Sequence, residues 1–170
     1  MKTICTEEMK AMLLFIADRV MESKPMLTEV DSRIGDGDHG IGMETGFRAV
    51  KEVLSGEDFD TVNQLFRQTG IAMLNSMGGA SGVVFSTMFM GGVKGMQDTS
   101  QIDTQAFADM MSRSLEAVQK RGGARRGDKT MVDALEPACA AMSEYQGGDF
   151  GEIFCRAAEA AQKGVEETKR

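Results

Sequence analysis

The chain has 170 residues, a hydrophobic fraction of 42 % and a formal net charge of −7. This length suits one domain with a sizeable core, and the acidic balance argues against nucleic acid, whose phosphates bind basic surfaces. No apolar run approaches the ~18 residues of a membrane span, and the first residues lack the apolar stretch of a signal peptide. The three cysteines show neither disulfide nor zinc spacing, which is typical of a cytoplasmic protein.

Helical periodicity runs along nearly the whole chain, and no segment shows the two-residue alternation of a strand. Pro25 suits a first helical turn, and Asp60, Asp103 and Thr130 stand where helix N-caps are expected. Short connections between such helices favour antiparallel neighbours. We therefore predict an all-α, up-down antiparallel bundle or barrel of about seven helices, forming a single domain over residues 1–170. The helical segments are 6–22, a shorter one at 25–34, then 40–54, 60–76, 82–96, 104–121, 131–143 and 150–168.

The most informative segment is Asp31-Ser-Arg-Ile-Gly-Asp36-Gly-Asp38-His39-Gly40, which ends with the one histidine of the chain. Its glycines let the backbone double back and bring three carboxylates together. Clustered carboxylates repel each other unless a cation lies among them, and oxygen ligands select Mg²⁺, Mn²⁺ or Ca²⁺. Counted from Asp36, the EF-hand positions of Gly and Glu hold Ile41 and Phe47, which excludes that motif. Because Mg²⁺ often takes further ligands from phosphates, a nucleotide site is the leading interpretation and a solvated turn is the alternative.

Two glycine-rich loops interrupt the helical pattern further along the chain. In the first, Met77-Gly-Gly-Ala-Ser81-Gly82, a helix that starts with free N–H groups attracts phosphate, whereas a tight turn capped by Ser81 is the alternative. The second, residues 120–130, places basic side chains around three glycines, and a solvated turn is its alternative. Neither loop is a Walker A sequence, and the ordered motifs of protein kinases are missing.

In its motifs the chain resembles the nucleotide-binding (ADP-binding) subunit of bacterial dihydroxyacetone kinase, the DhaL type. The resemblance rests on Asp31 with Gly-Asp36-Gly-Asp38-His39-Gly40, on Gly78-Gly79-Ala80-Ser81-Gly82, and on Gly127-Asp128-Lys129-Thr130-Met131-Val132-Asp133-Ala134-Leu135. It implies a barrel of eight antiparallel helices with ADP or ATP at one end. It also implies a phosphotransferase of the glycerone kinase type that is active only with partner subunits.

The resemblance further implies roles for individual residues. Asp31, Asp36 and Asp38 match three aspartates that hold two Mg²⁺ ions against the phosphates. The chain has Gly42 where the family usually has Asn and Ala80 where it usually has Ser, so two polar side chains are lost, although the backbone amide at position 80 remains. No residue of this chain is assigned to covalent catalysis. The positions expected to bind the nucleotide are His39, Gly42, Gly79, Ala80, Ser81, Gly122 and Met131.

The partners follow from the resemblance as well. They are a kinase subunit that holds dihydroxyacetone on its own histidine, and a phosphohistidine protein of the phosphotransferase system that rephosphorylates ADP in place. Two alternative functions stay open: a nucleotide-binding partner that signals to a transcriptional regulator, and the equivalent subunit of a kinase for another small ketose. A homodimer is a further candidate assembly. Family members continue for about another helix past the position of Arg170, so we expect the last C-terminal segment of the family to be missing here.

Overall fold

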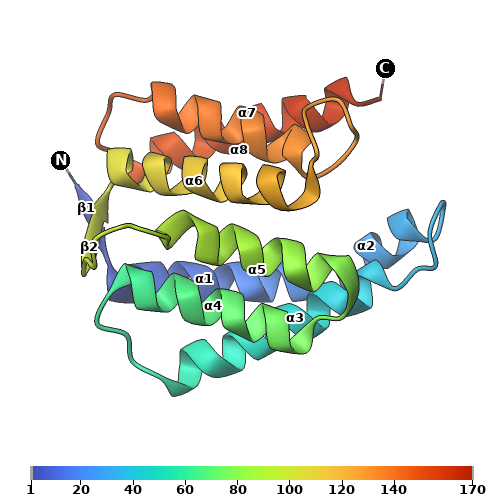
Figure 1. The fold of residues 1–170 in the computed structure, drawn as a ribbon, viewed down its shortest axis with the longest axis horizontal. Helices are drawn as coiled ribbons and strands as arrows, with labels where there is room; N and C mark the ends of the chain where they lie inside the picture. The colour runs from blue at the N-terminus through green and yellow to red at the C-terminus, as the bar shows by residue number, and fades with distance from the viewer. Residues whose placement is uncertain (1, 170) are drawn as a thin grey trace.

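A computed structural model describes residues 2–169, which form a bundle of antiparallel helices (Figure 1). The all-α prediction is confirmed, and the described range contains eight helices, one for each predicted helical segment although the predicted count is about seven. Pro25 lies in the first turn of α2, as predicted, and separates this short helix from α1. The helices are α1 (Thr6–Glu22), α2 (Lys24–Asp31), α3 (His39–Gly56), α4 (Val62–Ser76), α5 (Gly79–Val93), α6 (Thr104–Gly122), α7 (Val132–Glu144) and α8 (Phe150–Glu167).

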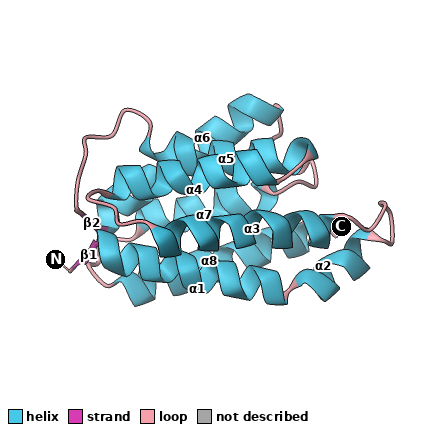
Figure 2. Cartoon of the chain, turned by 90° about the horizontal axis from the view of Figure 1, so that it is seen from below, coloured by secondary structure: helices cyan, strands magenta, loops and turns pink. Residues whose placement is uncertain are grey.

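Seven of the helices follow one another around the bundle in the order α1, α3, α4, α5, α6, α7 and α8. The short α2 packs on α3 and extends past the end of the other helices (Figure 2). Because neighbours alternate in direction, the α2–α3, α4–α5 and α6–α7 connections all lie at the same end (Figure 1). The three loops singled out from the sequence are these three connections.

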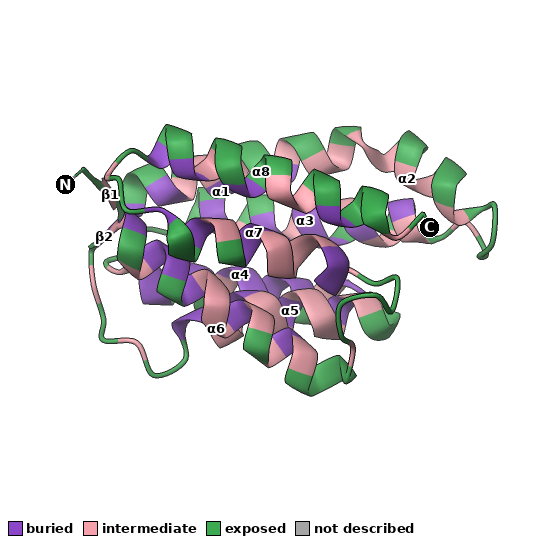
Figure 3. Cartoon of the chain, turned by 90° about the horizontal axis from the view of Figure 1, so that it is seen from above, coloured by how far each residue is buried: buried purple, intermediate pink, exposed green. Residues whose placement is uncertain are grey.

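The core consists of the apolar stripes that the periodicity indicates. In α1, for example, Met9, Leu13 and Ala17 are buried at helical spacing, and buried residues gather on the inward faces of the other helices as well (Figure 3). An apolar cavity of about 790 Å³ lies among α1, α3, α4, α5, α6 and α8, lined mainly by Met, Phe and other hydrophobic side chains. No helix of the described residues has both the length and the apolar character needed to cross a bilayer.

Two local expectations are wrong. The N-cap of α4 is Thr61, whose hydroxyl accepts a hydrogen bond from the N–H of Gln64, and not Asp60. The chain also contains two strands, β1 (Thr3–Cys5) and β2 (Gln101–Asp103), which pair antiparallel. Strands of three residues are too short to show an alternating pattern, so a long-range pairing of this kind leaves no local signal. Asp103, by contrast, caps α6 as predicted, accepting from the N–H of Ala106 at 2.8 Å.

Candidate functional site

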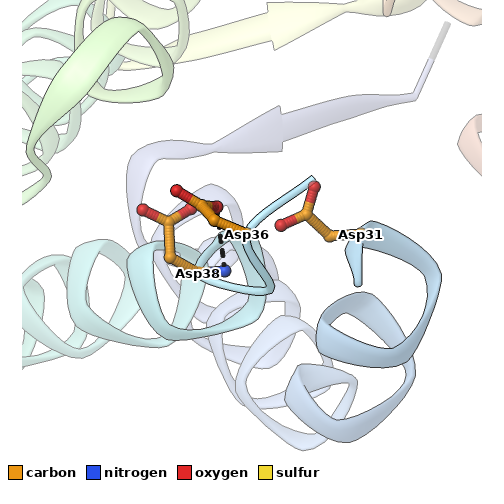
Figure 4. A group of neighbouring side chains, drawn as sticks. All are labelled: Asp31, Asp36 and Asp38. Carbon is orange, nitrogen blue, oxygen red and sulfur yellow. Dashed lines mark hydrogen bonds between the residues drawn. The ribbon is translucent and has the colours of Figure 1, made fainter. Parts of the chain in front are cut away.

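The loop between α2 and α3 gathers the three predicted carboxylates (Figure 4). One oxygen each from Asp31, Asp36 and Asp38 lies within 4.8 Å of the others. Asp31 ends α2, and its Oδ2 accepts hydrogen bonds from the N–H groups of Gly37 at 2.9 Å and His39 at 3.4 Å. The Asp31 carboxylate therefore closes the loop, and this holds Asp36 and Asp38 opposite the end of α2.

Repulsion dominates the electrostatics of this cluster. The Asp36 carboxylate raises the pKa of Asp38 above its ordinary value, partial dehydration and Asp31 act in the same direction, and only His39 opposes them. A cation among the three groups would remove this repulsion. Three carboxylate oxygens are also the hard ligands that Mg²⁺, Mn²⁺ and Ca²⁺ prefer. The residues present therefore fit a divalent cation.

A close helix crossing sets the position of Asp31. Gly40, in the first turn of α3, is buried against α2, and an added Cβ would lie 2.5 Å from the carbonyl oxygen of Lys24 and closer still to the Thr28 hydroxyl. Beside this crossing, the Lys24 ammonium binds the Glu44 carboxylate at 2.6 Å. The two helices can approach this closely only because residue 40 lacks a side chain. Sequence reasoning included Gly40 in the motif without finding this role.

A pocket of about 470 Å³ lies at the same end of the bundle. It is formed by the starts of α3, α5 and α7, the end of α6, and the loop that precedes α7. Its remaining walls are largely apolar, with Val84, Phe85 and Val118 among them. Segments far apart in sequence thus meet around one space. Five of the residues predicted to bind nucleotide line it: His39, Ala80, Ser81, Gly122 and Met131.

Two further predicted residues are not among those that line the pocket. Gly42 lies in α3, where an added Cβ would meet nothing within 4 Å, and Gly79 begins α5 with a φ of +66°. Helix α5 starts at Gly79, earlier than the predicted residue 82, so Ser81 belongs to its first turn. The N-cap is Gly78 and no side chain caps this end. The alternative of a turn capped by Ser81 is therefore wrong.

The first turn of α7 contains a residue whose full role the sequence does not reveal. Thr130 is the predicted cap of α7, and its hydroxyl accepts a hydrogen bond from the N–H of Val132 at 3.2 Å, although the N-cap position itself is Met131, which provides no side-chain cap. Asp133 is 3 % exposed and accepts hydrogen bonds from Gly127 and Thr130. A capping box predicts the bond from Thr130, three residues before Asp133, whereas the bond from Gly127 depends on the fold of the loop and leaves no signal in the sequence.

Comparison with known proteins identifies the family of this chain. Residues 33–170 match the DAK2 domain, and the chain belongs to this family. The matched range contains the whole pocket lining together with Asp36 and Asp38, while Asp31 lies just before it.

Among individual relatives, the resemblance to the DhaL type is confirmed. The ADP-binding subunit DhaL of PEP-dependent dihydroxyacetone kinase 1 from Listeria innocua is 35 % identical over 127 residues, which are 75 % of this chain and 64 % of the relative. The corresponding Escherichia coli subunit is 34 % identical over 118 residues, 69 % of this chain and 56 % of the relative. The chain thus spans less than two thirds of the length of these relatives.

Two other comparisons extend the picture. L-erythrulose 1-kinase from Mycolicibacterium smegmatis is 30 % identical over 168 residues, covering 96 % of this chain and 29 % of the relative. The crystal structure of the dihydroxyacetone kinase from C. freundii in complex with AMP-PNP and Mg²⁺ has a TM-score of 0.79 at 24 % identity. That match covers 98 % of this chain and 30 % of the other, and it establishes the shared helical fold.

Proposed function

We propose that this chain is the nucleotide-binding subunit of a multi-subunit dihydroxyacetone kinase. The observation that carries the proposal is the meeting of three distant segments, 31–39, 80–81 and 122–131, at one end of the bundle, where a carboxylate cluster adjoins a pocket. His39 connects the two features, because it follows Asp38 directly and also lines the pocket. Relatives named as ADP-binding subunits of dihydroxyacetone kinases support the same function.

In this proposal Asp31, Asp36 and Asp38 hold two Mg²⁺ ions together with the phosphates of ADP or ATP. Bound Mg²⁺ supplies charge neutralisation and orients the phosphate oxygens for in-line transfer. His39 and Ser81 contact the phosphates, and the uncapped N–H groups in the first turn of α5 provide fixed donors toward them. Residues Gly42, Gly79 and Ala80 belong to the same proposed site through the family resemblance.

The pocket walls take the rest of the nucleotide. Gly122 and Met131 lie on the α6–α7 side, and the apolar side chains around them exclude water from the bound molecule. Phosphoryl transfer needs positioning and charge stabilisation more than covalent help from the protein. The groups present here therefore match the task of presenting a γ-phosphoryl group to an acceptor held elsewhere.

The acceptor is assigned to a separate kinase subunit. The chain has one histidine, and it lies at the proposed phosphate site, so none remains for covalent binding of dihydroxyacetone. A phosphohistidine protein of the phosphotransferase system is the proposed donor that recharges ADP in place. A second acceptor is also a candidate, because a relative that matches nearly the whole chain is named L-erythrulose 1-kinase.

Reconstitution tests this function. The chain is mixed with a dihydroxyacetone-binding kinase subunit and a phosphohistidine donor, with dihydroxyacetone or L-erythrulose as acceptor and ADP in catalytic amounts. Asp36→Asn removes a proposed ligand, and Asp149→Asn, at the cap of α8, is the matched control. We expect turnover only in the complete mixture, its loss in the Asp36 variant, and normal turnover in the control.

The outcomes separate the alternatives. Turnover by the isolated chain would contradict the division of labour between subunits, and failure of calorimetry to detect Mg-ADP binding would contradict the nucleotide site. If turnover requires stoichiometric ATP, the phosphoryl donor is ATP that exchanges with solution, and not a phosphohistidine protein that recharges bound ADP. Preference for L-erythrulose would identify the other ketose as the acceptor.

A further inference from the structure

The buried carboxylate of Asp133 forms hydrogen bonds with the backbone of the loop between α6 and α7. Asp133 lies in the first turn of α7 and is 3 % exposed. Its Oδ1 accepts a hydrogen bond from the N–H of Gly127 at 2.5 Å, and its Oδ2 accepts one from the N–H of Thr130 at 2.9 Å. Both donors belong to the loop, so a single side chain joins two of its backbone groups to the helix that follows.

The loop needs such support because its backbone is unusual. Gly127 has a φ of +95°, and Lys129, with a φ of +59°, is the one non-glycine residue with positive φ in the described part of the chain. A side chain at positive φ costs free energy. The two hydrogen bonds to Asp133 span this strained stretch, from Gly127 to Thr130, and so offset that cost.

The chemistry of the acceptor matters here. The N–H groups of Gly127 and then Thr130 hold the pKa of Asp133 below its ordinary value, which keeps the side chain ionised near neutral pH. A carboxylate accepts at both oxygens, whereas the amide of an asparagine accepts at one atom and turns a donor toward the second N–H group. The pair of bonds therefore requires an ionised acid at this position.

Asp133 is itself held in place by α8. Gly164 packs directly on the Asp133 carbonyl oxygen, and an added Cβ would also lie 2.9 Å from the Cγ of Pro137. At the C-terminal end of the same helix, Glu167 binds Arg126 of the loop at 2.8 Å. The loop is thus tied to α7 through Asp133 and to α8 through Arg126.

This loop is also a wall of the pocket. Ala124, Thr130 and Met131 line the 470 Å³ space, whereas Asp133 does not. Thr130 connects Asp133 to the pocket, because its N–H group donates to Asp133 while the residue itself lines the pocket. Any loss of the Asp133 bonds would therefore act on the pocket through the loop.

We propose that Asp133 is the positioning residue that holds the 123–131 loop in the conformation required for nucleotide binding. This inference rests on the proposed function, since the pocket is taken to be the nucleotide site. Asp133 belongs neither to the carboxylate cluster nor to the lining of the pocket. It acts on the pocket only by fixing the conformation of the loop that forms one of its walls. The third motif of the family resemblance contains Asp133 without giving it a role, and the inference supplies that role.

Asp133→Asn tests the proposal, with Asp103→Asn as the matched control. Asp103 also accepts a backbone N–H bond, from Ala106 at 2.8 Å, but it lies at the opposite end of α6. Calorimetry measures the Kd for Mg-ADP, and thermal melting measures stability. We expect Asp133→Asn to raise the Kd about tenfold or more, whereas Asp103→Asn, whose amide oxygen can still accept the single bond from Ala106, should keep the wild-type Kd. Equal Kd values for folded Asp133→Asn and wild type would overturn the proposal.

Hydrogen exchange of the unmodified protein provides a test that needs neither a variant nor nucleotide. The amides of Gly127 and Thr130 should exchange much more slowly than those of neighbouring loop residues that form no hydrogen bond. Exchange at the free-loop rate would refute the positioning role, even where Asp133→Asn does not fold. If instead the wild type shows protected amides but binds no Mg-ADP, the proposed function fails while the anchoring of the loop stands.

Discussion

Replacing Gly40 with alanine should disturb the carboxylate cluster without changing any of its side chains. Gly40 lies where α3 crosses α2, and an added Cβ would stand 2.5 Å from the carbonyl oxygen of Lys24 and closer still to the Thr28 hydroxyl. Because Asp31 ends α2, separation of the two helices moves Asp31 away from Asp36 and Asp38.

The size of the effect follows from these contacts. Restoring ordinary van der Waals separation requires the helices to part by about 0.5 Å or more, which reaches the ~0.5 Å tolerance of a preorganised site. Alanine favours a helix over glycine by about 1 kcal/mol, while overpacking costs about 1–3 kcal/mol. The net loss is about 1 kcal/mol, or a Tm lower by about 2–4 °C for a chain of this size. We expect the Kd for Mg-ADP to rise about tenfold.

Thermal melting and calorimetry with Mg-ADP check both numbers. Gly56→Ala is the matched control, because Gly56 is the last residue of the same helix and an added Cβ there meets nothing within 4 Å. The control should keep the wild-type Kd and a Tm at or above that of the wild type. If Gly40→Ala melts and binds like Gly56→Ala, the crossing does not set the geometry of the cluster and the reasoning is refuted.

Four further outcomes are expected. Asp36→Asn removes a charged oxygen ligand and should abolish measurable Mg-ADP binding in calorimetry, as EDTA should for the wild type; unchanged affinity would contradict the metal site. Mg-ADP at about 100 times its Kd should stabilise the fold by about 2.7 kcal/mol, and a melting curve indifferent to it would count against the pocket. The N–H of Glu152 lowers the pKa of Asp149, the cap of α8. The stability from this cap is therefore present above pH 3.8 and is lost as pH falls through the lowered pKa. In urea titrations at a series of pH values, Asp149→Asn should reduce the loss of stability at acid pH. Ile153 is fully buried, and Ile153→Ala should cost about 2–5 kcal/mol in the same assay.

The sequence alone was sufficient for the helical class and for the acidic loop. Helix formation depends on contacts between residues three and four apart, so the stripe Met9, Leu13 and Ala17 is visible as a local pattern. Asp31, Asp36 and Asp38 lie within one short segment, and their approach follows from the loop that contains them. The confirmed all-α fold and the compact carboxylate cluster both have this local origin.

Only the tertiary structure decided the features that depend on distant or exact contacts. The choice of Thr61 over Asp60 as a cap depends on a single residue of register, and the pairing of β1 with β2 joins segments about a hundred residues apart. The pocket forms because four helices present their ends to one another, and the roles of Gly40 and Asp133 depend on packing that no sequence period records. Each of these results from the geometry of packed helices, which fixes positions to within an ångström, whereas a sequence pattern fixes only which face of a helix turns inward.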